Sequence, residues 1–155
     1  MRWSMGVALV MLVGAGAAVT HAQKPQAPAR PAAVAANAVK PVATVGEIMQ
    51  LMTIPLSNAV FEAGGEPPKD DKSWDDVRGK AIALAESGNL LMMVPRARDG
   101  DEWMRLSKAM IDTGAVAIKA AEAKDPDAMF EAGAQIYAVC SNCHAKYDPS
   151  ISRVQ

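Results

Sequence analysis

Residues 125–148 read DPDAMFEAGAQIYAVCSNCHAKYD, and this stretch decides the fold that the rest of the chain has to complete. Asp125 followed by Pro126 offers an N-cap and a proline at the first helical position, which together predict a helix start. Small or apolar residues then recur at alternating spacings of four and three, on one face of a helix that runs to about Lys146. These residues are Met129, Gly133, Ile136, Cys140 and Cys143.

The last turns of this helix carry Cys140-Ser141-Asn142-Cys143-His144. C-x-x-C-H is the pattern by which haem is attached covalently, with each cysteine forming a thioether. Residues i and i+3 share a helix face, so Cys140 and Cys143 can both reach the edge of one porphyrin. We therefore expect one haem c per chain, with His144 as the proximal ligand of the iron.

Three other interpretations of this motif are weaker. A structural zinc site uses four Cys or His ligands, whereas the chain has two of each, and His21 lies in an expected signal peptide. A thioredoxin-type redox pair needs a βαβ setting, and no such alternation of strands and helices occurs here. A local disulfide fits the spacing but gives no reason for a histidine directly after the second cysteine.

The N-terminus has the parts of a secretory signal peptide. Residues 1–4 include Arg2, an apolar run follows from Met5 to Val19, and small residues precede a cleavage site expected after Ala22. The run is shorter than the roughly 20 residues that a membrane span needs, although an uncleaved anchor remains an alternative. We expect a periplasmic protein with no membrane span in the mature chain.

Cleavage would leave residues 23–155, enough for one domain with a core. Residues 23–43 are rich in Ala and Pro and predict a linker. The whole chain has 16 basic and 17 acidic residues, and the segment 1–22 takes Arg2 and no acid with it. Such a balance gives no indication of nucleic-acid binding, which favours a basic surface.

Three further helices are expected before the last one. The first covers about 44–63, with Pro55 predicting a kink; the second begins with Ser73 as N-cap and stops before Pro95; the third starts near Asp101. Their inward residues are expected to be Val45, Ile48, Met49, Met52, Leu56, Ala59, Val60 and Ala63; Trp74, Val77, Ala81, Leu84, Gly88 and Leu91; and Trp103, Leu106, Met110, Ala117 and Ala121.

Gly114 is expected to weaken the third of these helices. No stretch alternates with the period of two that is typical of a strand. The chain is therefore predicted to be all-α, an antiparallel four-helix bundle covering residues 44–150 with covalently bound haem.

The expected signal peptide, the four helices and the C-x-x-C-H motif on the last helix together resemble the class II c-type cytochromes, the cytochrome c prime family. The resemblance covers residues 44–150. Tyr147 and the stretch Thr44–Met52 belong to the same resemblance. It implies that the first helix supplies the residue on the distal side of the haem, which is apolar in high-spin members and methionine in low-spin members. High-spin members commonly carry an arginine one turn earlier, near a propionate; here that turn has Ile48 or Val45. Lys146, Arg96 and Arg98 are possible substitutes.

The distal ligand is expected to be a methionine, since His144 is the last histidine of the mature chain. The resemblance favours Met52, with Met49 as the alternative. A His/Met-ligated haem transfers single electrons, so we expect an electron carrier rather than an enzyme, with redox proteins as partners; whether two chains form a homodimer is left open. The competing hypothesis is a five-coordinate haem that binds a small gas such as NO or CO.

Overall fold

The computed structural model describes residues 40–149, which form helices and loops with no strand among them. The expected signal peptide and residues 23–39 of the expected linker lie outside the described residues. The helices are α1 (Val45–Ile48), the π-helix η2 (Met49–Thr53), α2 (Ile54–Gly65), α3 (Asp71–Met92), α4 (Glu102–Ala123) and α5 (Pro126–Tyr147). None of the helices in the described part of the chain is long and apolar enough to cross a membrane.

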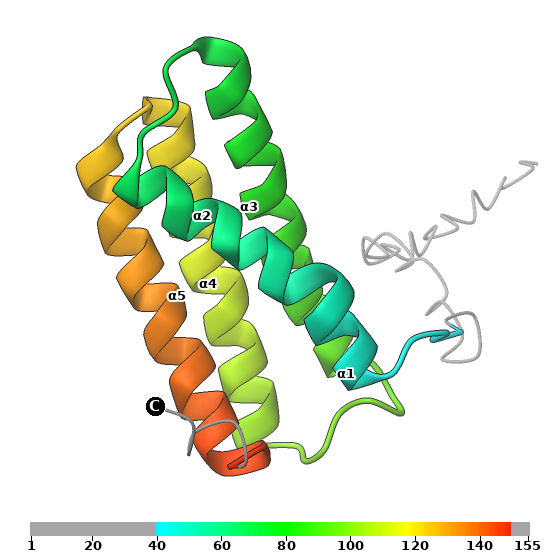
Figure 1. Ribbon diagram of the computed structural model, residues 1–155. Coiled ribbons are helices and arrows are strands. Elements are labelled where there is room, and N and C mark those ends of the chain that lie inside the picture. Colours follow the sequence, from blue (N-terminus) through cyan, green and yellow to red (C-terminus); the bar gives the residue numbers. More distant parts are fainter. Residues whose placement is uncertain (1–39, 150–155) are drawn as a thin grey trace, which may run out of the picture. The chain divides into compact units, whose positions relative to one another are not determined.

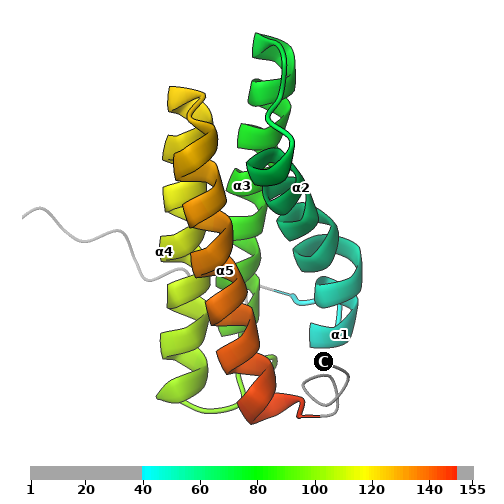
Figure 2. The ribbon, with the colours of Figure 1, turned by 60° about the vertical axis from the view of Figure 1, so that its left-hand side comes forward.

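Because α1, η2 and α2 follow one another without a break, the described residues contain four helical stretches. α2 packs against α3 and α5, and α4 packs against α3 and α5, so each stretch has two neighbours. Figures 1 and 2 show α3, α4 and α5 side by side, with the first stretch crossing them obliquely. The all-helical prediction is confirmed, with the helices arranged as a bundle.

The inward faces predicted for the two central helices are confirmed. In α3 and α4 the buried residues include Trp74, Val77, Ala81, Leu84, Gly88, Leu91, Trp103, Leu106, Met110, Ala117 and Ala121. On the first stretch the agreement is partial, since Ile48, Val60 and Ala63 are buried while the other predicted residues are half-buried. On α5 Met129 and Ile136 are completely buried.

Gly114, predicted to weaken this helix, lies within α4 where the helix packs on α3. The helix is continuous through it, and a Cβ atom at this position would lie 2.8 Å from the Cβ of Ala85 on α3. Gly88 on α3 has the same role, since a Cβ atom there would lie 2.7 Å from the carbonyl oxygen of Ser107. These two glycines let α3 and α4 approach closely.

The starts of α3 and α5 are capped by side chains, and the cap of α3 is not the predicted residue. Asp125 accepts a hydrogen bond from the backbone N–H of Ala128, which confirms the predicted start of α5. The N-cap of α3 is Asp70, not Ser73: the Asp70 carboxylate accepts from the backbone N–H of Ser73 at 2.8 Å. A carboxylate three residues earlier satisfies that N–H and adds a turn to the helix.

The first stretch is not a regular α-helix, because η2 interrupts it just before Pro55. The backbone N–H of Ile54 donates to the carbonyl of Met49, five residues earlier. Proline has no N–H for the carbonyl four residues before it, and its ring clashes with that carbonyl in a regular α-helix. A π turn accommodates this conflict without ending the helix. The irregularity predicted at Pro55 therefore appears as a change of helical register upstream of the proline.

Candidate functional site

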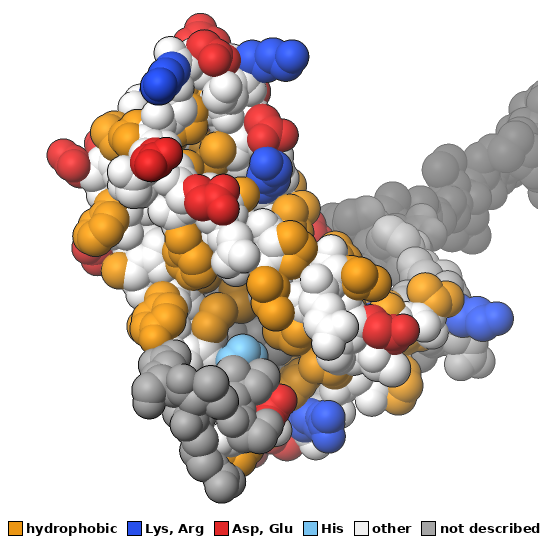
Figure 3. Space-filling model, viewed as in Figure 1, with side chains coloured by type: hydrophobic (Ala, Val, Ile, Leu, Met, Phe, Trp, Pro, Cys, Tyr) orange, Lys and Arg blue, Asp and Glu red, His pale blue; other side chains and the backbone are white. Residues whose placement is uncertain are grey.

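A cavity of about 510 Å³ lies between the first helical stretch and α5, and residues of α3 and α4 complete its wall. Cofactor sites typically enclose roughly 300–1,000 Å³. Cys140, Cys143 and His144 all belong to its lining. Figure 3 shows the only histidine of the described residues at the surface, with hydrophobic side chains around the recess beside it.

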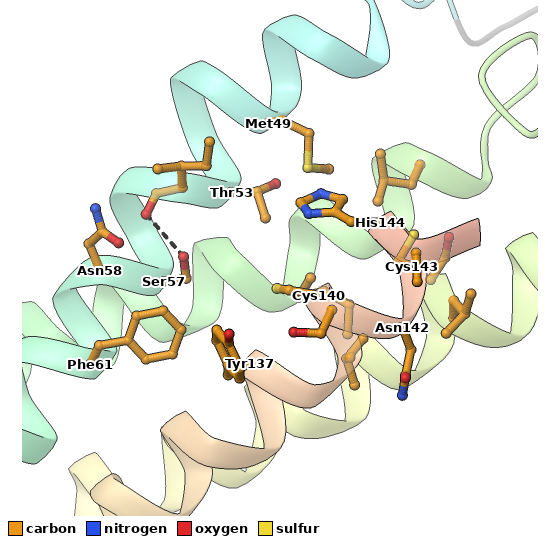
Figure 4. A pocket seen from close by; sticks show the side chains of 18 residues that line it. Met49, Thr53, Ser57, Asn58, Phe61, Tyr137, Cys140, Asn142, Cys143 and His144 are labelled. Carbon is orange, nitrogen blue, oxygen red and sulfur yellow. Dashed lines mark hydrogen bonds between the residues drawn. The ribbon is translucent and has the colours of Figure 1, made fainter. Parts of the chain in front are cut away.

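The C-x-x-C-H residues lie on the last turns of α5, as predicted, and all three are half-buried. Both thiols are free. Figure 4 shows the two cysteine side chains and the His144 imidazole directed into the cavity from the same helix. The structure thus brings together the three residues that the sequence singled out.

The wall opposite α5 is formed by η2 and α2, and η2 contributes Met49 to the lining. In Figure 4 the Met49 side chain extends from η2 toward the His144 imidazole. Met52, which the family resemblance favours as distal ligand, is not among the lining residues. In an α-helix Met49 and Met52 would share a face, but the wider turn of a π-helix aligns residues four or five apart instead. Thr53 accordingly joins Met49 in the cavity wall.

Burial of the cysteines favours uncharged sulfur. It raises the pKa of the Cys140 thiol to about 11, with the neighbouring Cys143 adding to the rise. The pKa of Cys143 is also raised, by burial and then by the Glu102 carboxylate. A reactive dithiol requires lowered pKa values, so the site lacks the electrostatics of a thioredoxin-type pair. A thioether sulfur, which has no ionisable proton, suits this environment.

A zinc site also finds no support in this region. Among residues 40–149 no group of three or more His, Cys, Asp or Glu side chains could hold a metal ion. An iron held mainly by a macrocycle needs only one or two axial ligands from the protein. The imidazole and the facing thioether fit that requirement.

None of the described residues in the lining is Lys, Arg, Asp or Glu. Arg96, one of the three candidates for a propionate contact, donates instead to the backbone carbonyls of Ala43 at 2.8 Å and Leu90 at 3.1 Å. Lys146 lies over the Tyr147 ring, 5.6 Å from its centroid. The cavity therefore fits the apolar body of a porphyrin, whose carboxylates would have to lie at its open side.

Sequence reasoning missed the hydroxyl groups of the cavity wall. Thr53, Ser57 and Ser107 line it and are 3%, 6% and 4% exposed. Thr53 and Ser57 are four residues apart next to Met49, so polar residues at this spacing on an otherwise apolar face were the available signal. Ser107 follows the buried Leu106 and gave no such signal.

No protein-family model, no curated protein and no solved structure matches this chain. The function of the cavity therefore has to be inferred from the chemistry of its own residues.

Proposed function

We propose that the chain is an exported c-type cytochrome that carries single electrons through one haem c held in this cavity. The observation that carries the proposal is that two thiols, the adjacent imidazole and a thioether on the facing wall line the same cavity. Cys140 and Cys143 are the proposed covalent anchors and His144 the proposed proximal ligand. When bound, the haem supplies an iron centre that takes up and releases one electron.

Met49 is the proposed ligand on the opposite side, in preference to Met52. Its support is its position in the cavity wall and its direction toward His144 in Figure 4. A histidine and a methionine together close both axial positions, so the iron can exchange electrons while substrates are kept away. Met/His ligation also raises the reduction potential of a haem.

The mostly apolar lining supports the same function. Its residues hold the imidazole and the thioether in a low-dielectric setting, where burial also keeps the cysteine sulfurs neutral. The proposal agrees with the class II c-type cytochrome resemblance and with the export expected from the sequence, since thioether formation needs reduced cysteines outside the cytosol to meet haem.

Mass spectrometry of the mature protein, produced with the haem-attachment machinery, tests the covalent link. We expect the mass of the chain plus one haem, which stays with the protein in acidified organic solvent. Cys140→Ala or Cys143→Ala should leave a single thioether or none, whereas Ser141→Ala, between the two anchors, should leave the mass of the adduct intact. A bare chain with extractable haem would contradict the proposal.

Absorption and electron paramagnetic resonance spectra of the ferric protein separate electron transfer from gas binding. A low-spin spectrum without added ligand supports the Met49 thioether as the sixth ligand. A high-spin spectrum would mean that neither methionine is bound, and a five-coordinate protein that binds NO or CO would then be the better interpretation.

A further inference from the structure

Large apolar side chains are exposed along the line where α2 and α5 meet. Phe130 and Tyr137, seven residues apart on α5, are 67% and 51% exposed, and Ile54 at the start of α2 is 48% exposed. Figure 3 shows a band of hydrophobic side chains over the first helical stretch and α5, reaching the histidine. Exposed aromatic side chains that gather on one face typically mark an interaction surface.

These side chains line a groove that continues the cavity. A second hollow of about 250 Å³ is lined by Phe61 from α2 and by Phe130, Gly133 and Tyr137 from α5. Phe61 and Tyr137 line both hollows, and Figure 4 shows their side chains next to each other between the two helices. Phe61 lies against α5, because a Cβ atom added to Gly133 would be 3.3 Å from its ring. The α2/α5 groove therefore runs from the C-x-x-C-H cavity to Phe130.

Four exposed carboxylates lie around the Phe130 end of this groove. They belong to Glu62, Glu66, Asp127 and Glu131. The first two are two residues either side of Gly64, where an added Cβ atom would be 2.9 Å from the Cα atom of Phe130. The other two lie three residues before Phe130 and one residue after it. No Lys or Arg occurs between Val45 and Glu66 or between Pro126 and Ala145.

None of the four carboxylates has an ion-pair partner among residues 40–149. The salt bridges of this part of the chain involve only α3, α4 and the residue that ends α4. Glu131 accepts one hydrogen bond, from the neutral Gln135 amide at 3.5 Å. The same range contains no group of three or more acidic, Cys or His side chains that could hold a metal ion. Unpaired carboxylates beside an apolar groove complement a surface with a basic rim.

We propose that the α2/α5 groove, with Phe61, Phe130 and Tyr137 at its centre, is the docking surface for a redox partner protein. The contact face of this partner is apolar in the middle and carries Lys or Arg at its rim. The inference rests on the proposed electron transfer, because the groove begins at the cavity that is proposed to hold the haem. Redox partners associate weakly through small interfaces, which suits a short apolar groove. Attraction between oppositely charged rims steers such encounters and speeds association.

A second copy of this chain fits the groove less well. Two copies that met through this surface would bring together the same helices, whose only Lys or Arg is Lys146. Lys146 is at the other end of α5, over the Tyr147 ring. The carboxylates around Phe130 would therefore stay unpaired in such a dimer, and like charges brought together oppose binding.

Titration of the isotope-labelled holoprotein with mitochondrial cytochrome c, followed by nuclear magnetic resonance, tests the surface. The probe is a small basic redox protein with lysines around its haem edge. Both proteins are kept reduced, so that binding is measured without net electron transfer. At low ionic strength we expect the amide signals of the groove residues to shift. The shifts should largely vanish at about 1 M salt, where the Debye length is about 3 Å.

Three results of this titration would overturn the proposal. They are the absence of shifts, shifts confined to α3 and α4, and a dimer of the protein alone that forms through the groove. Mass spectrometry of the same sample reports haem attachment separately. If haem is attached and the probe does not bind, only the docking surface is wrong, whereas a bare chain contradicts the proposed function itself.

Phe130→Ser tests the apolar centre. Since the side chain is mostly exposed, the variant should fold, and we expect the dissociation constant for the probe to rise about 10–30-fold, as for a central aromatic side chain of an interface. Val116→Ser is the matched control, because Val116 is 38% exposed on α4 and lines neither hollow. An unchanged dissociation constant for Phe130→Ser, or an equal rise in the control, would overturn the assignment.

Glu131→Lys tests the acidic rim. We expect association with the probe to slow about 3–10-fold at low salt and to depend less on salt, because one attraction becomes a repulsion. Asp112→Lys is the matched control, since it changes the net charge equally at an exposed position of α4. Equal effects of the two variants would mean that the probe responds to net charge alone, and the groove would then not be its docking surface.

Discussion

The Tyr147 hydroxyl, at the end of α5, donates a hydrogen bond to the Asp99 carboxylate in the loop before α4. The other oxygen of that carboxylate accepts from the backbone N–H groups of Trp103 at 2.9 Å and Asp101 at 3.1 Å. The Tyr147 and Trp103 rings meet edge to face, with centroids 4.9 Å apart. The helical turn that carries the C-x-x-C-H motif is thereby fastened to the start of α4.

This contact makes stability depend on pH at both extremes. The hydrogen bond from Tyr147 is the main cause that holds the pKa of Asp99 below its usual range. Burial, and then the hydrogen bond to Asp99, raise the pKa of Tyr147 to about 12. A lowered carboxyl pKa stabilises the fold above about pH 4, and this contribution is lost as pH falls through the folded value. A raised phenol pKa stabilises below about pH 10 and is lost as pH rises toward 12.

Circular-dichroism melting curves across pH measure both losses. We expect Asp99→Asn to flatten the acid side of the Tm profile and Tyr147→Phe to flatten the alkaline side. Phe keeps the ring that packs on Trp103, so only the hydroxyl contact is removed. Profiles parallel to that of the unmodified protein would mean that the contact does not form in solution.

Met49→Leu should convert the holoprotein from low-spin to high-spin and let the reduced form bind carbon monoxide. Leucine has nearly the same volume, so the packing cost should stay below about 1.5 kcal/mol. Met52→Leu is the matched control, since Met52 lies on the same helical stretch and outside the cavity lining. If Met52→Leu changes the spin state and Met49→Leu does not, the π register of η2 is not that of the holoprotein.

Folding should depend on the cofactor. The cavity of about 510 Å³ is lined largely by apolar side chains from the first helical stretch, α3, α4 and α5, and without a cofactor these side chains have no partner atoms on the cavity side. Apolar surface left open to water does not stabilise the fold. We expect apoprotein to keep helical far-UV circular dichroism and to lose near-UV signal and cooperative melting. A cooperative, native-like melt of apoprotein would contradict a cofactor in this cavity.

Gly114→Ala should destabilise the protein by about 1–3 kcal/mol, because the new methyl group would press on Ala85 and force α3 and α4 apart. Gly79→Ala is the matched control, since Gly79 is exposed on α3 with no atom within 4 Å of an added Cβ. This control should gain up to about 1 kcal/mol of helix propensity. Urea titration measures both, and a neutral Gly114→Ala would mean that the two helices are less closely packed.

Most of the helical organisation could be predicted because it depends on near neighbours in the chain. The period of apolar residues decided which faces of α3 and α4 are buried, and Asp125-Pro126 decided where α5 begins. The placement of the C-x-x-C-H motif on the last turns of α5 followed from the same spacing. Such signals operate within one or two turns, where the geometry of a helix is nearly constant.

The sequence by itself therefore determined four helices, the face that each of the two central helices buries and the motif on the last one. Only the tertiary structure decided that Met49 rather than Met52 faces His144, because the π turn of η2 combines the demand of Pro55 with packing against α3. It also decided the pairing of Tyr147 with Asp99, 48 residues apart, and the hydrogen bond between Thr53 on η2 and Ser87 on α3. These relationships join helices that are distant in the chain, and no local periodicity encodes how such helices are rotated against one another.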